Sequence, residues 1–194
     1  MIHFENKSGY LELILGCMFS GKTSALIEIY KQNVLCKKKC LVINFIGDKR
    51  YSDTNMSTHD KNEIPCVFTE KLFELQKSSS PQDNPDNNDV ILINEGQFFP
   101  DLIEFVNVYL NQKNKMIYIC GLDGDYKKEK FGNLLDLIPQ ADNYRKLKAL
   151  CINCRDGTRA PFTFRVSSEK KQTLIGSDEY IPVCRECYNM LNQK

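Results

Sequence analysis

The chain has 194 residues, of which 42% are hydrophobic and 26% charged, and its formal net charge is +1 at pH 7. This length allows one well-packed domain, or a core domain with a small appendage, but excludes two full-sized domains. No apolar run is long enough to span a membrane, and the near-neutral charge disfavours a protein built mainly to hold nucleic acid. A small-molecule substrate fits this composition better.

The cysteine content indicates the cellular setting. Nine cysteines are present, an odd number, and five of them lie scattered in apolar or lysine-rich segments. The first ten residues contain neither a basic segment nor an apolar core, so we expect no secretory signal. Reduced thiols in a cytoplasmic protein are therefore the expected state.

The first predicted element is a buried strand at residues 10–15, and the next residues match the phosphate-binding pattern G-x-x-x-x-G-K-[ST]. Glycines at both ends of this loop let successive backbone N–H groups face a triphosphate, and the helix predicted from about residue 23 adds its positive N-terminal end. Lys22 would reach the β- and γ-phosphates, and Thr23 would offer its hydroxyl to Mg²⁺. The residues assigned to phosphate binding are Gly16, Ser20, Gly21, Lys22 and Thr23.

Strands and helices then alternate along the chain. Apolar runs predict further strands at 40–46, 64–69, 89–94 and 115–121. Helical patterns occur at 70–76, from Pro100 onward and at 133–141. The polar segment 77–89 predicts a surface loop. This alternation predicts an α/β domain with a mainly parallel sheet through about residue 148.

Polar residues follow several of the predicted strands. Gly16, Asp48, Glu95 and Asp123 each come just after a strand end. Ligands of open α/β sheets bind beyond the carboxyl ends of the strands, so we expect these residues to converge on one crevice.

Two residues of this crevice could act on a phosphoryl group. Glu95 could take a proton from an attacking hydroxyl or from water, and Arg50 could neutralise charge on the transferred group. The structural alternatives are a solvated loop acid for Glu95 and an ordinary surface arginine for Arg50.

The other four cysteines form a C-x₂-C…C-x₂-C pattern, which is typical of a tetrahedral zinc site. A β-ribbon, predicted at Phe162–Val166 and Gln172–Ile175, would close over the metal. All four ligands come from the protein, so the zinc would be structural rather than catalytic. A redox dithiol or unpaired buried cysteines are the alternatives. The four residues are Cys151, Cys154, Cys184 and Cys187.

Taken together, the motifs resemble the type II thymidine kinase family, including its cellular and poxvirus-like members. The matching segments span roughly residues 9–188: G-x-M-F-S-G-K-T at 16–23, D-x-R-Y-S at 48–52, T-H-D at 58–60, E-G-Q-F-F-P at 95–100, L-D-G at 122–124, F-G at 131–132 and the two cysteine pairs. The resemblance implies ATP-dependent phosphorylation of the thymidine 5′-hydroxyl, giving dTMP and ADP. It also implies a RecA-like domain (1–148), a zinc-binding lasso domain (149–194), a homotetramer and feedback inhibition by dTTP.

The resemblance also implies roles for individual residues. Glu95 matches the family's catalytic base, while Arg50 and Lys22 match residues that act at the phosphates, with Asp48 beside them. The nucleoside pocket would be lined by Met18, Phe98, Leu122, Tyr126, Phe131, Thr163 and Tyr180.

Three positions depart from the family pattern. Asn94 replaces an aspartate that would help to hold hydrated Mg²⁺, Cys17 replaces a proline in the phosphate loop, and Tyr126 replaces a phenylalanine. The competing functions are a deoxynucleoside kinase of broader range, a nucleic-acid-dependent P-loop ATPase with a zinc ribbon, and a nucleotide-binding protein without catalysis.

Overall fold

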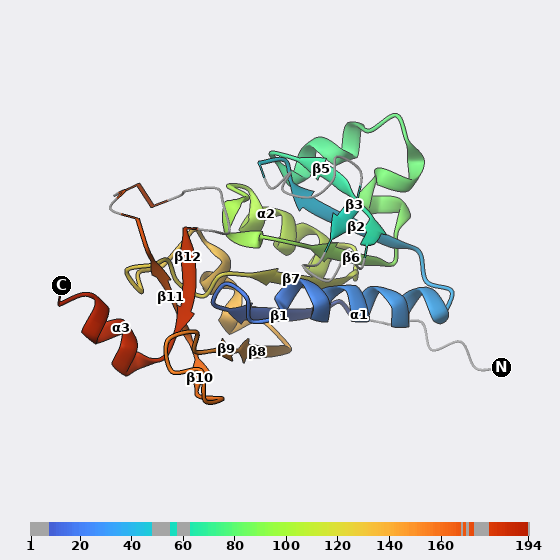
Figure 1. Cartoon of the computed structure of the whole chain (residues 1–194). Helices are drawn as coiled ribbons and strands as arrows, with labels where there is room; N and C mark the ends of the chain where they lie inside the picture. Colours follow the sequence, from blue (N-terminus) through green and yellow to red (C-terminus); the bar gives the residue numbers. More distant parts are fainter. Residues whose placement is uncertain are drawn as a thin grey trace.

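The structure is a computed structural model and describes residues 8–47, 55–57, 63–167, 169, 171–172 and 179–193. Its centre is a six-stranded sheet in the order β5-β2-β6-β7-β1-β8 (Figure 1). Every pairing within this sheet is parallel, which confirms the predicted α/β architecture. In the same order, the strands are Val67–Thr69, Cys40–Phe45, Val90–Ile93, Met116–Gly121, Tyr10–Gly16 and Asn143–Leu147.

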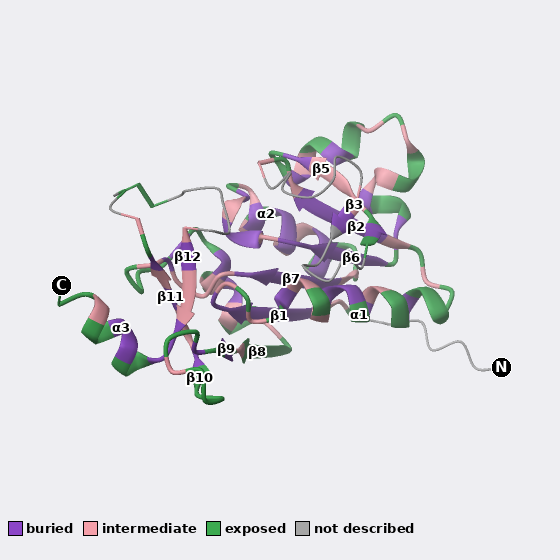
Figure 2. Cartoon of the chain, viewed as in Figure 1, coloured by how far each residue is buried: buried purple, intermediate pink, exposed green. Residues whose placement is uncertain are grey.

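The four central strands are buried on both faces because helices cover the sheet from both sides (Figure 2). Alternate side chains of a strand point to opposite faces, so Leu13 packs into one core and Ile14 into the other. Helix α1 (Lys22–Leu35) covers the Ile14 face. The Leu13 face is covered by α2 (Leu102–Asn107), its π-helical continuation η5 (Val108–Gln112) and the 3₁₀ segments η1 (Leu72–Lys77) and η6 (Leu134–Gln140).

Three parts of the sheet domain differ from the sequence-based expectation. The strand predicted at 64–69 is divided in two: β4 (Glu63–Pro65) pairs with β3 (Asn55–Ser57), while β5 joins the main sheet. The helices predicted at 70–76 and 133–141 are 3₁₀ segments, and Pro139 lies inside the second. The polar loop contains the 3₁₀ turns η2 (Pro81–Asp83) and η3 (Pro85–Asn87).

The C-terminal region builds a separate small core at one end of the sheet (Figure 1). Its strands are β9 (Ala149–Leu150), β10 (Arg159–Ala160), β11 (Phe162–Arg165) and β12 (Tyr180–Val183), followed by α3 (Arg185–Leu191). The return strand of the ribbon is β12 rather than the predicted 172–175, of which 173–175 lie outside the described residues. Among the described residues, no helix combines the length and apolar character that crossing a membrane would require.

The packing of α2 supplies a stability prediction. Phe105 is fully buried between this helix and the sheet, so Phe105→Ala should lower the free energy of unfolding by about 3–5 kcal/mol in urea titrations. Leu35, 84% exposed at the end of α1, is the matched control. Leu35→Ala should change the free energy of unfolding by less than about 0.5 kcal/mol. Equal losses in the two variants would contradict this assignment of the core.

Candidate functional site

The phosphate loop connects β1 to α1, as the sequence predicts. Gly21 has a φ of 86°, in the left-handed region that favours glycine. At Gly16, a Cβ atom would lie 2.6 Å from the carbonyl oxygen of Leu147 and 2.7 Å from Ser20 Oγ. Both glycines are therefore required by the path of the backbone.

Lys22 is held close to this loop. Its side chain is buried, and its Nζ donates a hydrogen bond of 2.8 Å to the carbonyl of Cys17. Ser20 Oγ donates to the same carbonyl at 2.8 Å. Thr23 follows at the start of α1 and is half-buried, so its hydroxyl lies at the helix end that would face a phosphate.

Glu95 is the second residue after β6 and adopts a left-handed backbone conformation, with a φ of 55°. Its carboxylate accepts a hydrogen bond of 2.6 Å from Nε2 of the buried Gln97. The other end of the Gln97 amide accepts a 3.0 Å hydrogen bond from the backbone N–H of Leu122, at the end of β7. Gln97 therefore fixes the predicted base against the neighbouring strand end.

Two of the aromatic residues predicted to bind nucleoside are in direct contact. The Phe98 and Phe131 rings meet edge to face, with centroids 5.3 Å apart. Phe45, from the end of β2, stacks on Phe98 at 4.9 Å. Phe98 follows Glu95 by one 3₁₀ turn, so these rings place an apolar surface suited to a base or sugar close to Glu95.

The C-terminal ribbon contacts the phosphate loop directly. Thr163 Oγ1 accepts a 3.0 Å hydrogen bond from the backbone N–H of Met18, and Cys17 Sγ donates to the carbonyl of Ala160 at 3.2 Å. Burial raises the pKa of the Cys17 thiol, which keeps it in the protonated form that can donate. Met18 and Thr163, predicted to share a pocket, are therefore neighbours.

A buried arginine joins the remaining two predicted pocket residues. Arg165 is only 4% exposed; its guanidinium stacks 3.7 Å from the Tyr126 ring centroid and donates to the hydroxyl of Tyr180. It also donates to the backbone carbonyls of Glu169, Lys171 and Gln172.

Sequence reasoning missed Gln97 and Arg165 as site residues. Gln97 lies in the quoted E-G-Q-F-F-P motif, which was a usable signal, but its partner Leu122 is distant in sequence. Arg165 gave no signal in the sequence, since its partners become neighbours only in the fold. Asp48 and Arg50 lie outside the described residues, so their predicted roles stay predictions.

The four clustered cysteines meet as the spacing predicts, with ligand sulfurs within 4.8 Å of one another. Burial disfavours the Cys151 thiolate, but backbone hydrogen bonds, including one from Cys184 N–H at 3.3 Å, outweigh it and lower the pKa of Cys151 to about 6. Four sulfurs at this separation fit a tetrahedral metal ion.

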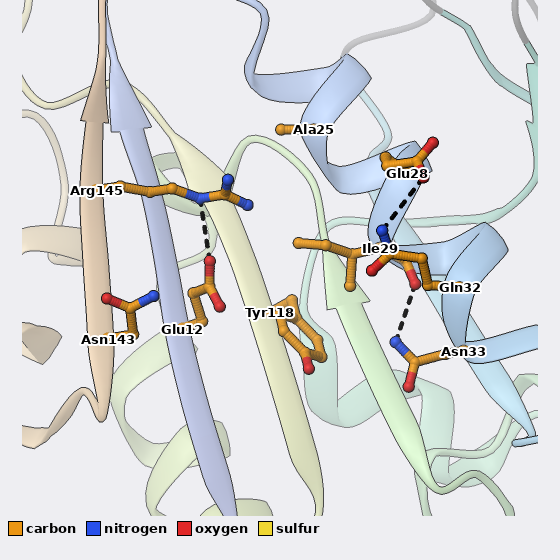
Figure 3. Close-up of a pocket in the computed structure, with 9 residues that line it drawn as sticks. All are labelled: Glu12, Ala25, Glu28, Ile29, Gln32, Asn33, Tyr118, Asn143 and Arg145. Carbon is orange, nitrogen blue, oxygen red and sulfur yellow. Dashed lines mark hydrogen bonds and ion pairs between the residues drawn. The ribbon is translucent and has the colours of Figure 1, made fainter. Parts of the chain in front are cut away.

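A hollow of about 380 Å³ lies between α1 and β8, away from the carboxyl ends of the strands (Figure 3). Its buried Glu12 is already paired, with Arg145 Nε at 3.0 Å and the Tyr10 hydroxyl at 3.0 Å. Burial and this hydrogen bond raise the pKa of Tyr10 to about 12, so the phenol remains a donor. The contacts of Glu12 are structural, and we assign no chemistry to this hollow.

Comparison with known proteins identifies the relatives of the chain. The family model described as thymidine kinase matches residues 9–188. The chain is 40% identical over 188 residues to the thymidine kinase of Yaba monkey tumor virus, covering 96% of this chain and 98% of the relative. It is 38% identical over 181 residues to the thymidine kinase of sheeppox virus, which covers 93% of this chain and 97% of the relative. It is 40% identical over 182 residues to the thymidine kinase of Oryza sativa subsp. japonica, which covers 93% of this chain and 66% of the relative.

The close approach of Gly132 to Gln97 yields a second prediction. A Cβ atom at Gly132, whose φ is 61°, would lie 2.1 Å from the backbone oxygen of Gln97, whereas one at Gly157, with a φ of 92°, would contact nothing within 4 Å. Gly157→Ala should destabilise the fold by about 1–2 kcal/mol through backbone strain alone. Gly132→Ala should cost ~1–3 kcal/mol more, because an overpacked contact adds to that strain.

Urea unfolding of the two glycine variants measures this difference. Equal destabilisation would mean that the chain at Gly132 can move away from Gln97 without cost.

Proposed function

This chain belongs to the thymidine kinase family, and we propose that it performs the family's reaction with Glu95 as the base and the 16–23 loop as the phosphate site. The reaction is transfer of the γ-phosphate of ATP to the 5′-hydroxyl of thymidine, giving dTMP and ADP. The observation that supports this most strongly is the shared strand edge: the phosphate loop, Glu95 and Leu122 follow β1, β6 and β7, which are parallel.

At the donor end, backbone N–H groups of the loop and the start of α1 would hold the phosphates of ATP. Lys22 would leave the carbonyl of Cys17 for the β- and γ-phosphate oxygens. Thr23 would hold Mg²⁺, which when bound would neutralise charge on the phosphates. Asp48 and Arg50 would complete this end, with Arg50 stabilising the transferred group.

At the acceptor end, Glu95 would remove the proton of the 5′-hydroxyl as the oxygen attacks phosphorus. The Gln97 amide would hold the Glu95 carboxylate in position for this task. Phe98, Phe131 and Leu122 would line the thymidine site. Thr163 and Tyr180 would cover it from the ribbon, with Tyr126 from the segment after β7 held against them by Arg165, and Met18 would touch the nucleoside from the phosphate loop.

The four-cysteine cluster would hold a structural Zn²⁺ that orders this cover. All four ligands are protein sulfurs, so the metal would supply shape and stability rather than a reactive water. We place the domain boundary at 148/149, because β8 ends at Leu147 in the main sheet and β9 begins at Ala149 in the small core.

The remaining properties follow from family membership. We propose a cytoplasmic enzyme, inhibited by dTTP and assembled as a homotetramer. The edge strand β8 supports self-association: four of its five residues are exposed, and Tyr144 is 57% exposed.

Replacing the base tests the proposed mechanism. Glu95→Gln should lower kcat for thymidine phosphorylation by a factor on the order of 10² or more, since the amide cannot accept the proton. Glu104→Gln on the exposed side of α2 is the matched control and should retain full activity. A Glu95→Gln enzyme that turns over normally would remove Glu95 from this role.

The same assay should be run across nucleosides. Thymidine should be preferred over deoxyuridine and deoxycytidine; comparable kcat/KM values for all three would instead identify a deoxynucleoside kinase of broader range.

Metal content tests the cysteine cluster. Protein purified without chelator should contain one zinc per chain, and Cys184→Ser should lose the metal and unfold at lower temperature. Cys36→Ser, an exposed thiol at the end of α1, should retain both zinc and stability. Wild-type protein without zinc would refute the assignment.

A further inference from the structure

The end of β6 carries a buried polar network that holds no carboxylate. Asn94 is 2% exposed and directly follows the last residue of β6. Its Nδ2 donates a 2.9 Å hydrogen bond to Oδ1 of Asn44 in β2. Its Oδ1 accepts a hydrogen bond of 2.9 Å from the thiol of Cys120 in β7. The network thus ties together the ends of three adjacent strands with uncharged groups.

The direction of these hydrogen bonds is fixed by the backbone. Oδ1 of Asn44 also accepts from the N–H of Phe45 at 3.1 Å, so this oxygen cannot exchange places with the amide nitrogen without losing that bond. Asn94 must therefore point its NH₂ group at Asn44, which leaves its oxygen to Cys120. The whole Asn94 side chain is set by its neighbours and is already satisfied.

This position is where a phosphate-loop enzyme normally needs charge. In such enzymes, Mg²⁺ is held by the Ser or Thr of the loop together with an aspartate from a nearby strand end. Here β6 is separated from β1, the strand of the loop, only by β7. Thr23 fits the first requirement, but Asn94 does not meet the second, because its oxygen faces a thiol and bears no charge.

Other described carboxylates at these strand ends are also engaged. Glu95 is bound by Gln97, and Asp123 forms an ion pair with Lys146. A carboxylate at position 94 would have two effects on the phosphate site: it would attract the metal, and it would repel a nucleotide that arrives without one. Because the network is uncharged, it neither attracts the metal nor repels the metal-free nucleotide.

We propose that the Asn44–Asn94–Cys120 network makes the phosphate site bind metal-free nucleotide almost as tightly as the Mg²⁺ complex. Mg²⁺ then interacts with the protein mainly through Thr23 and the phosphates themselves. This inference rests on the proposed function, since it takes the 16–23 loop as the nucleotide site. It concerns nucleotide binding, so it can be tested apart from turnover.

Calorimetric titration with ADP, once in excess EDTA and once in excess Mg²⁺, measures the effect. In the wild-type protein, the two dissociation constants should differ by less than about threefold. In Asn94→Asp, metal-free ADP should bind at least about tenfold more weakly than MgADP, a typical size for coupling between two bound groups. Asn143→Asp on the exposed part of β8 makes the same chemical change and should keep the wild-type ratio.

A second variant guards against misfolding of Asn94→Asp, whose carboxylate would face the Asn44 oxygen. Asn44→Asp keeps both acceptor contacts, to Asn94 and to Phe45 N–H, while adding a charge one side chain further away. Asn44→Asp should also weaken the binding of metal-free ADP relative to MgADP, but by a smaller factor than Asn94→Asp.

The possible failures are distinct. A wild-type preference for MgADP of about tenfold or more, or folded aspartate variants with the wild-type ratio, would overturn the role of the network. If ADP binds under neither condition, the phosphate-loop assignment is wrong, and the inference falls with it. Thymidine phosphorylation by the same preparation shows which of the two has failed.

Discussion

The positions of Glu95 and of the end of β7 depend on the hydrogen bonds of one buried amide, the side chain of Gln97. Its nitrogen holds the carboxylate of Glu95 and its oxygen holds the backbone of Leu122, so the ends of β6 and β7 stay in one arrangement. Space for this side chain comes from glycine: a Cβ at Gly121 would lie 2.3 Å from Gln97 Oε1. A carboxylate held in this way loses little freedom when a ligand binds beside it, which is how positioned groups can lower a reaction barrier.

A second set of contacts joins the phosphate loop to the cysteine cluster. Cys17 of the phosphate loop belongs to the same small core as Cys151, Cys184 and Cys187, and its thiol is bonded to Ala160 of the ribbon. Order in the cysteine cluster is therefore transmitted to the loop through packed side chains as well as through the Met18–Thr163 hydrogen bond. The 16–23 loop and the ribbon are thereby held in a defined relation to each other.

Apolar runs predicted the central strands to within a residue or two, because a parallel strand buried on both faces has an unmistakable composition. Strand β8 escaped prediction since four of its five residues are exposed and carry no pattern. The phosphate loop, Glu95 and the cysteine cluster could be found from local motifs, and the pocket residues only by resemblance to a family. Gln97, Arg165 and the Asn44–Asn94 contact depend on residues far apart in the chain, which a single sequence does not bring together.

Arg165 shows how part of the C-terminal region is held in place. A buried guanidinium needs hydrogen-bond acceptors, and here its two terminal nitrogens donate to the carbonyls of Glu169, Lys171 and Gln172 and to the hydroxyl of Tyr180. Its Nε has no acceptor among the described residues. Moving Glu169, Lys171 and Gln172 away would strip a buried cation of its acceptors, so the charge opposes that movement. These three residues are thus held in place by a charge inside the protein. Part of the conformational entropy that substrate binding would otherwise cost is therefore already lost on folding.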